Sequence, residues 1–245
     1  MIKVPYTVTA DMSKYDGEAF NPNPNSIYLA QKKIELDKLS VGLGYSLIDS
    51  LPLIEDLSRY CGFTTTNDIR EIALQLEEDI AILYNGRLVS MCFCFPSGFR
   101  PNEKVGQTFM EMHAPVADNQ KLQRASDKVV ELISKPGNKY RRNVWTLTTS
   151  PELSRHPYYR SLEPAVSTIH NLYFRKETQT TVGYNDGRTA FFFVKVDVTP
   201  FVLLSPETQQ QVIDSINSMS DAILEYKGLN EIKKLFWFSK IKLYI

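Results

Sequence analysis

The sequence predicts an α+β fold, in which helices flank an antiparallel β-sheet within a single domain. Two segments, residues 80–95 and 171–201, each contain two apolar strand-like runs with a turn between them. Helical patterns precede, separate and follow these segments, and no linker or internal repeat divides the 245 residues. Strands joined by short turns pair antiparallel, and helices then cover the apolar faces of the sheet.

The first third of the chain is expected to begin with an arm and to continue as short helices. Residues 1–27 are polar and rich in turn formers, which predicts an extended or weakly ordered arm before a domain at 28–245. Apolar residues then recur at helical spacing. The expected elements are helices at 28–40 and 51–60, a turn at 41–46, and a helix opening within 64–76 with Thr66 or Asn67 as its N-cap.

A β-hairpin is the clearest local prediction. Asn85-Gly86 lies between the apolar runs 80–83 and 88–95. An Asn-Gly pair in this setting is the strongest short-range signal for a hairpin. The two runs are therefore expected to pair antiparallel.

The second half of the chain supplies the remaining elements. A helix is expected at 121–135, where an apolar stripe ends at Pro136-Gly137. A second helix is expected at 206–226, with Ser205 as its cap and Gly228 beyond its end. The expected strands are 143–149, 171–182 and 189–201, with a turn at 184–188.

Composition restricts the classes of partner. The chain has 28 acidic and 28 basic residues, so its formal net charge is zero. Nucleic acid and anionic membranes select basic surfaces, and neither is expected as the main partner. No run approaches the roughly 20 apolar residues of a membrane helix, and no secretory leader is expected. The three cysteines are expected to be reduced, buried thiols of a cytoplasmic protein.

Several common catalytic motifs are missing from the sequence. It contains no P-loop, no G-x-G-x-x-G, no H-E-x-x-H and no G-x-S-x-G elbow. A Cys/His nucleophile pair stays open, although no cysteine lies beside basic residues, where its pKa would fall. The histidines are His113, His156 and His170, so a three-histidine metal site would require all of them. His156 is expected in a turn or at the surface.

His113 lies near the end of a loop that begins FPSG, next to strands rich in aromatic residues. One histidine beside an apolar cavity is sufficient to hold haem. Haem propionates need basic partners, and Arg100, Lys104 and Arg175 lie in this loop and in an aromatic strand. The residues alone leave two alternatives open for His113, a haem ligand or a histidine that orders its loop through a backbone hydrogen bond.

An ordered block of motifs runs from residue 78 to residue 116 without gaps. Its members are Glu78-Asp79, Phe95-Pro96-Ser97, Phe99, Pro101, Glu103-Lys104, Gly106 and His113-Ala114-Pro115-Val116. Supporting similarities follow at 142–145, 175–180, 193–196 and 226–229. Together these motifs resemble the haem-dependent oxidative N-demethylase family, over about residues 70–230 of the chain.

The resemblance implies a PAS-like antiparallel sheet that binds haem b, with His113 as the axial ligand of the iron. It implies oxygen-dependent removal of a methyl group from a secondary or tertiary amine, with release of formaldehyde. Arg100, Lys104 and Arg175 would contact the propionates. Glu177 would face the substrate, since a carboxylate suits a protonated amine. Electrons would come from a flavin and iron–sulfur reductase on another chain, because this chain has no nucleotide motif and too few cysteines for a Cys₄ cluster.

Three residues depart from the family's pattern, namely Lys176, Thr178 and Lys195. They leave a second function open, a non-catalytic haem-binding or sensing module with the same PAS-like fold. A plain ion pair is also open for Arg175 and Glu177, which lie two apart and therefore share one face of a strand.

Overall fold

The computed structural model describes residues 2–39 and 42–242, with side chains up to residue 237. These residues form an α+β fold around one seven-stranded antiparallel sheet, which confirms the predicted fold class. The PAS-like form of the sheet stays a prediction. The strand order is β1-β5-β6-β7-β3-β4-β2. The strands are β1 (Ser13–Lys14), β2 (Gly44–Ser46), β3 (Asp79–Tyr84), β4 (Arg87–Cys92), β5 (Lys139–Thr148), β6 (Tyr173–Gly183) and β7 (Thr189–Pro200).

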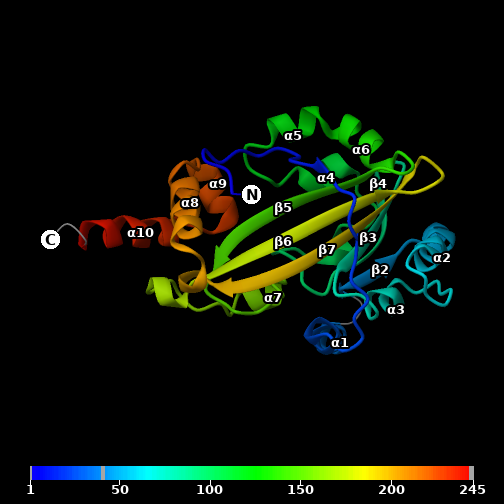
Figure 1. Cartoon of the computed structure of the whole chain (residues 1–245), viewed down its shortest axis with the longest axis horizontal. Helices are drawn as coiled ribbons and strands as arrows, with labels where there is room; N and C mark the ends of the chain where they lie inside the picture. The colour runs from blue at the N-terminus through cyan, green and yellow to red at the C-terminus, as the bar shows by residue number, and fades with distance from the viewer. Residues whose placement is uncertain (1, 40–41, 243–245) are drawn as a thin grey trace.

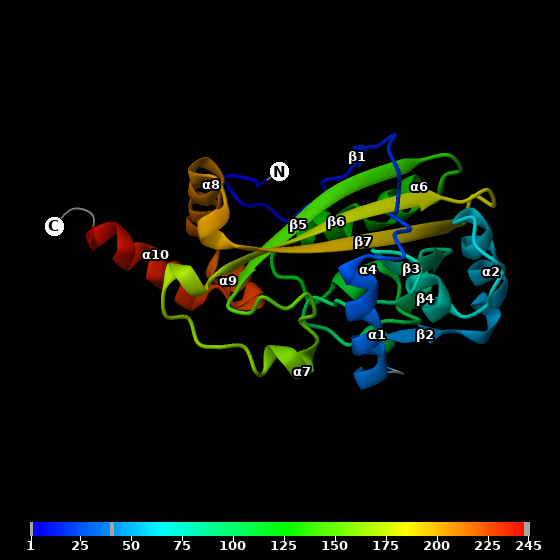
Figure 2. The ribbon, with the colours of Figure 1, turned by 60° about the horizontal axis from the view of Figure 1, so that its bottom comes forward.

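Helices lie against both faces of this sheet and at both of its ends. In Figure 1, α5 and α6 lie along the upper edge of the sheet, α2 and α3 lie at the end near β2, and α8 to α10 lie at the opposite end. Figure 2 shows the same two groups at the two ends. The helices are α1 (Ile27–Leu39), α2 (Leu51–Tyr60), α3 (Ile69–Ala73), α4 (Phe109–His113), α5 (Gln120–Arg124), α6 (Ser126–Ser134), α7 (Pro157–Arg160), α8 (Pro206–Asn217), α9 (Asp221–Lys227) and α10 (Asn230–Lys242).

The predicted hairpin is confirmed as the pair β3 and β4. Asn85 and Gly86 have φ of 48° and 72°, so both residues of the turn adopt the left-handed region that a tight hairpin of this kind requires. The second predicted pair is confirmed as β6 and β7, which run in register from Tyr173 opposite Pro200 to Gly183 opposite Ala190. These long strands form the floor on which the candidate site is built.

The N-terminal segment before α1 contacts the rest of the fold at several points. Its strand β1 pairs with the edge strand β5. Beyond β1 the arm crosses the sheet face turned toward the viewer in Figure 1 and reaches α1. There the backbone N–H of Asn21 donates to the Glu78 carboxylate at 2.8 Å, and its side-chain amide donates to Glu77 at 2.8 Å. The arm is therefore part of the folded unit, whereas the boundary at residue 27 stays a prediction.

The structure corrects three local predictions. The helix expected at 206–226 is two helices, because Ser220 starts a new one by accepting the N–H of Ile223 at 3.2 Å. Residues 44–46 of the expected turn at 41–46 form strand β2 at the sheet edge, and Val41 lies outside the described residues. The N-cap of α3 is Asp68, whose carboxylate accepts from the N–H of Arg70 at 2.9 Å, instead of Thr66 or Asn67.

The expected helix at 121–135 is interrupted as well. It consists of α5 and α6, which meet at Ala125. The core divides into a large apolar cluster around β3, β4 and β7 and a smaller one between the ends of β5 and β6 and helices α8 to α10. All three cysteines are buried and free, as expected. In the described part of the chain, no helix combines the length and the apolar character needed to cross a membrane.

Candidate haem and substrate cavity

A cavity of about 470 Å³ lies on the sheet face opposite to the one seen in front in Figure 1. The sheet supplies its floor, and α4, α6, α9 and the arm at residues 3–12 supply its walls. Alternate residues of β6 point into it, namely Arg175, Glu177, Gln179 and Thr181. The volume falls in the usual range for small-molecule and cofactor pockets.

His113 ends the short helix α4 and lines this cavity. A capping box fixes the start of the helix, since Thr108 accepts the N–H of Glu111 and Glu111 accepts the N–H of Thr108. Nδ1 of His113 lies 2.7 Å from the carbonyl oxygen of Phe109. A carbonyl can only accept, so Nδ1 carries the proton and Nε2 is left as the nitrogen with a lone pair.

The imidazole of His113 is held neutral. Burial lowers its pKa, the bond to the Phe109 carbonyl opposes this, and the nearby charges of Arg142 and Lys104 lower the pKa further. Its ring also packs on the Phe109 ring, with centroids 4.2 Å apart. A neutral imidazole whose Nδ1–H is anchored by a carbonyl is the form in which histidine binds metals. The two roles left open for His113, haem ligand and loop-ordering residue, are thus compatible. The hydrogen bond to the backbone orients the same imidazole ring whose Nε2 could bind a metal.

The buried side chain of Asp79 fixes the F-P-S turn at residues 95–97. The Asp79 carboxylate accepts the N–H groups of Cys94 at 3.0 Å and Phe95 at 2.8 Å. Lys32, which is fully buried on α1, lies 3.6 Å from this carboxylate and donates to the carbonyls of Ala73, Leu76 and Glu78. Asp79 therefore belongs to the support of the turn, and it does not line the cavity.

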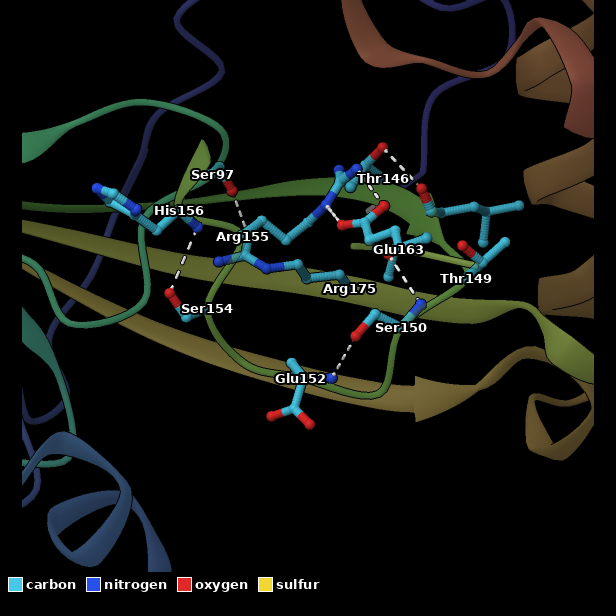
Figure 3. Close-up of polar contacts among 12 residues, drawn as sticks. Ser97, Thr146, Thr149, Ser150, Glu152, Ser154, Arg155, His156, Glu163 and Arg175 are labelled. Carbon is cyan, nitrogen blue, oxygen red and sulfur yellow. Dashed lines mark hydrogen bonds and ion pairs between the residues drawn. The ribbon is translucent and has the colours of Figure 1, made fainter. Parts of the chain in front are cut away.

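Arg175 fixes the same turn from the side of β6. Its Nη2 donates to the carbonyls of Phe95 at 2.7 Å and Leu153 at 3.2 Å, and Nε also reaches Leu153. Its Nη1 donates to Ser97 and, at 2.7 Å, to Glu177 (Figure 3 shows the contact with Ser97). All five N–H groups are used. The predicted contact of Arg175 with a propionate stays a prediction, and the contacts present are those of a residue that orders the cavity wall.

Glu177 is brought into the cavity beside Arg175, where it was predicted to face the substrate. Oε1 accepts from Ser97 and Arg175, and Oε2 accepts from the Gln179 amide at 2.7 Å. Burial alone would raise the pKa of Glu177, but the Arg175 charge and these hydrogen bonds hold the pKa below its ordinary value. The cavity therefore contains a fixed carboxylate anion.

The segment that follows β5 closes the cavity near the F-P-S turn. Residues 96–98 and 155 pair through backbone hydrogen bonds of 2.9 Å. The Arg155 guanidinium in turn binds Glu163 at 2.7 and 3.0 Å, as Figure 3 shows. His156 is buried here and accepts the N–H of Tyr158 at 3.3 Å, which makes it the cap of α7. Its position in a turn agrees with the expectation, whereas its burial does not.

Two cavity cations were missed as site residues in the sequence, Arg142 on β5 and Lys227 at the end of α9. Arg142 lies opposite Gln179 in the sheet register and therefore on the face of Glu177. Its Nε is buried without a partner, and its side chain makes no hydrogen bond or ion pair with the described residues. Burial lowers its pKa. A buried guanidinium with open donors fits an anionic group such as a haem propionate.

Lys227 is enclosed between aromatic rings. Its Nζ donates to the Trp145 carbonyl at 2.7 Å and lies 5.4 Å from the Tyr6 ring centroid and 5.7 Å from that of Trp145. Burial lowers the pKa of Lys227 to about 8, with Glu177 opposing and Arg155 and Arg142 adding to the effect. The motifs at 142–145 and 226–229 were the available signals for both cations, but a sequence does not show that a helix end and a strand face one cavity.

The other two predicted propionate partners differ in position. Lys104 lines the cavity, close enough to His113 to influence its pKa. The Arg100 side chain is 56% exposed, pairs with Glu103 at 3.2 Å and is not among the lining residues. The structure therefore brings His113, Lys104, Arg175 and Glu177 together and leaves Arg100 outside. The role predicted for Arg100 stays a prediction without support from the geometry.

The three departures from the family's pattern lie on the sheet face away from the cavity. Lys176 pairs with Asp197 at 3.4 Å, Thr178 donates to Asn143 at 3.1 Å, and Lys195 pairs with Glu77 at 2.6 Å. In β6, residues 175, 177 and 179 line the cavity, so 176 and 178 point the other way. None of the three changes touches the cavity.

A family model described as haem-dependent oxidative N-demethylase, alpha subunit-like, matches residues 51–236, which is more than half of the chain. No curated protein matches the chain. The matched range includes His113, Arg142, Arg175, Glu177 and Lys227. Among the described residues, no three histidine, cysteine, aspartate or glutamate side chains gather into a metal site, so the three-histidine alternative has no support.

Proposed function

The chain belongs to the haem-dependent oxidative N-demethylase, alpha subunit-like family, and on that basis we propose that its cavity holds haem b and demethylates an amine. The substrate is a secondary or tertiary methylamine, and the products are formaldehyde and the shorter amine. Bound haem would supply the iron that activates dioxygen. The single observation that carries this proposal is the neutral His113 in the cavity wall, with Nδ1 anchored and Nε2 without a partner among the described residues.

The residues present fit this cofactor. His113 provides one neutral imidazole, and the apolar floor includes Phe93, Phe192 and Val194. Arg142 provides a buried guanidinium with no partner, which is the feature a propionate requires. We assign Arg142 and Lys104 as the propionate partners, in place of Arg175, whose donors are all in use.

Glu177 is the residue we propose to receive the substrate amine. Its carboxylate is ionised, and Oε2 accepts only one hydrogen bond, so it can accept another from an ammonium group. Hydrogen bonds from Arg175 and Ser97 hold the Glu177 side chain in position. The protonated amine is thus held and oriented by an anion that the protein has already placed.

The proposal also includes an electron donor on another chain and a cytoplasmic location. The chain shows no nucleotide motif, so we propose that a separate flavin and iron–sulfur reductase reduces it in the cytoplasm. The non-catalytic haem module is not favoured, because the departures that suggested it lie on the opposite sheet face from the cavity.

The test is formaldehyde release by the haem-loaded protein with trimethylamine or dimethylamine, oxygen, and a ferredoxin with its reductase as surrogate donor. We expect formaldehyde that depends on amine and donor, and its loss to the level of the protein-free control in His113→Ala. His170→Ala is the matched control, since His170 is exposed in a short 3₁₀ helix, and it should behave as wild type. Haem-loaded, reducible wild type that releases no formaldehyde from any methylated amine would support the sensing module instead.

A further inference from the structure

The cavity contains more positive than negative charge. Its lining cations are Lys3, Lys104, Arg142, Arg155, Arg160, Arg175 and Lys227, and its lining anions are Asp11 and Glu177. Three of the cations are neutralised by ion pairs, namely Lys3 with Asp11, Arg155 with Glu163, and Arg175 with Glu177. The other four form no ion pair with a described residue. Arg160 is exposed to solvent, so Lys104, Arg142 and Lys227 remain. The two propionates of haem would balance two of these three and leave one cavity cation without an anionic partner.

Lys227 and Glu177 are opposite charges that face the same space without touching. The Glu177 charge contributes to the electrostatic environment of Lys227, yet their charged atoms are more than 4.0 Å apart. Each retains capacity for a partner. Lys227 has three donors and uses one, on the Trp145 carbonyl, and Oε2 of Glu177 has one lone pair open.

A fixed cation and a fixed anion separated by open space are complementary to a zwitterion. The Glu177 carboxylate suits an ammonium group, and the Lys227 ammonium suits a carboxylate. Both protein groups are already held in place, Glu177 by Ser97, Arg175 and Gln179, and Lys227 by the Trp145 carbonyl and two rings. A simple alkylamine would bind the anion and add no partner to the buried Lys227 ammonium.

We propose that the substrate of this cavity is an N-methylated amino acid, with its amine on Glu177 and its carboxylate on Lys227. The reaction rests on the proposed demethylase function, whereas the binding of the carboxylate does not. For N,N-dimethylglycine, dioxygen, two electrons from the reductase and two protons give N-methylglycine, formaldehyde and water. One N–CH₃ bond is broken, one oxygen atom enters formaldehyde and the other enters water.

The charge state of Lys227 agrees with this assignment. Burial lowers its pKa to about 8, so the ammonium is mostly present at pH 7. The groups that face it are Glu177 on β6, Arg142 on β5, Arg155 in the closing segment, and Tyr6 on the arm. A bound carboxylate would stabilise the ammonium and keep the proton on Lys227.

The test compares binding of N,N-dimethylglycine and trimethylamine by calorimetry, on protein with and without haem. The two ligands share the methylated nitrogen and differ in the carboxylate. We expect wild type to bind N,N-dimethylglycine at least about tenfold more tightly, the value of one charge-assisted hydrogen bond. In Lys227→Met this preference should disappear, because N,N-dimethylglycine loses the partner of its carboxylate. Lys227→Arg should retain part of it.

Lys176→Met is the matched control, because Lys176 lies on the other sheet face in a half-exposed ion pair, and it should keep the preference. Equal binding of the two ligands by wild type, or an intact preference in folded Lys227→Met, would overturn the inference. Loss of the preference on adding haem would also overturn it, since a propionate then occupies Lys227. If the preference holds but no formaldehyde forms from any amine, the demethylase function fails and the carboxylate site stands.

Discussion

Arg175→Met lowers the free energy of unfolding by about 3–5 kcal/mol, the range for breaking a buried charge pair from one side. Arg175 is 1% exposed. Methionine keeps the packing of the aliphatic stem but removes all five N–H groups. The Glu177 carboxylate then loses its ion-pair partner, and the carbonyls of Phe95 and Leu153 lose the Arg175 donors. The measurement is the midpoint of chemical unfolding at pH 7, converted with the slope of the transition.

The dependence on pH identifies the cause. In wild type the pKa of Glu177 in the folded protein is held below its ordinary value. The pairing of Glu177 therefore stabilises the fold at pH values above the ordinary carboxyl pKa. This stabilisation is lost as the pH falls through the lower pKa of the folded state. In Arg175→Met the buried carboxylate has lost its ion-pair partner, so protonation of Glu177 becomes more favourable. The difference between variant and wild type should therefore shrink as the pH falls toward 4. A difference that is constant with pH would contradict a role for Glu177 in the loss.

Arg100→Met is the control for this experiment. Arg100 forms an exposed pair with Glu103, and such pairs contribute about 0–1 kcal/mol. The unfolding free energy of this variant should stay within about 0.5 kcal/mol of wild type. A large loss in Arg100→Met would show that the destabilisation does not depend on the buried contacts of Arg175.

Lys32→Met is expected to cost a similar amount, about 3–5 kcal/mol, at the second buried charge pair that supports the F-P-S turn. It removes the ion-pair partner of the fully buried Asp79 carboxylate, and it removes one donor from each of three carbonyls of residues 73–78. Because Asp79 holds the N–H groups of Cys94 and Phe95, the F-P-S turn should loosen as well. Hydrogen exchange at residues 93–98 measures that effect directly.

A double-mutant cycle separates pairing from packing. If Lys32 and Asp79 stabilise the fold as a pair, then Lys32→Met and Asp79→Asn together cost less than the sum of the two single losses. Lys33→Met is the matched control, since Lys33 is exposed on the same helix. Additive losses in the double variant would contradict the pairing, and so would a loss in Lys33→Met as large as that in Lys32→Met.

The parts of the fold that were predictable are those with local signals. Asn85-Gly86 specifies the β3–β4 turn through positive φ, and Ser205 and Gly228 mark the outer ends of the α8–α9 segment because a cap and a left-handed residue are local requirements. The break within that segment depends on Ser220, one of several serines there, and no local pattern distinguishes it. Strand β2 is three residues long and gains its partner β4 only in the folded chain.

The candidate site was predictable only in part, for a related reason. His113 and Glu177 were found because a motif and a strand alternation place them. Arg142 and Lys227 meet only because β5, β6 and α9 converge on one cavity, and that convergence is a property of the tertiary structure. Lys32 looks like a surface residue of a charged helix in the sequence, yet it is fully buried because α1 packs over the carbonyls of residues 73–78.

The central claim is that His113 holds haem in the cavity, and the visible absorption spectrum of the purified protein tests it most directly. Wild type loaded with haem should show a Soret band and one haem per chain. His113→Ala should lose or shift the band, with partial recovery when imidazole is added to replace the missing ring, whereas His170→Ala should match wild type. Wild type that takes up no haem, or a folded His113→Ala variant with an unchanged spectrum and stoichiometry, would contradict the account.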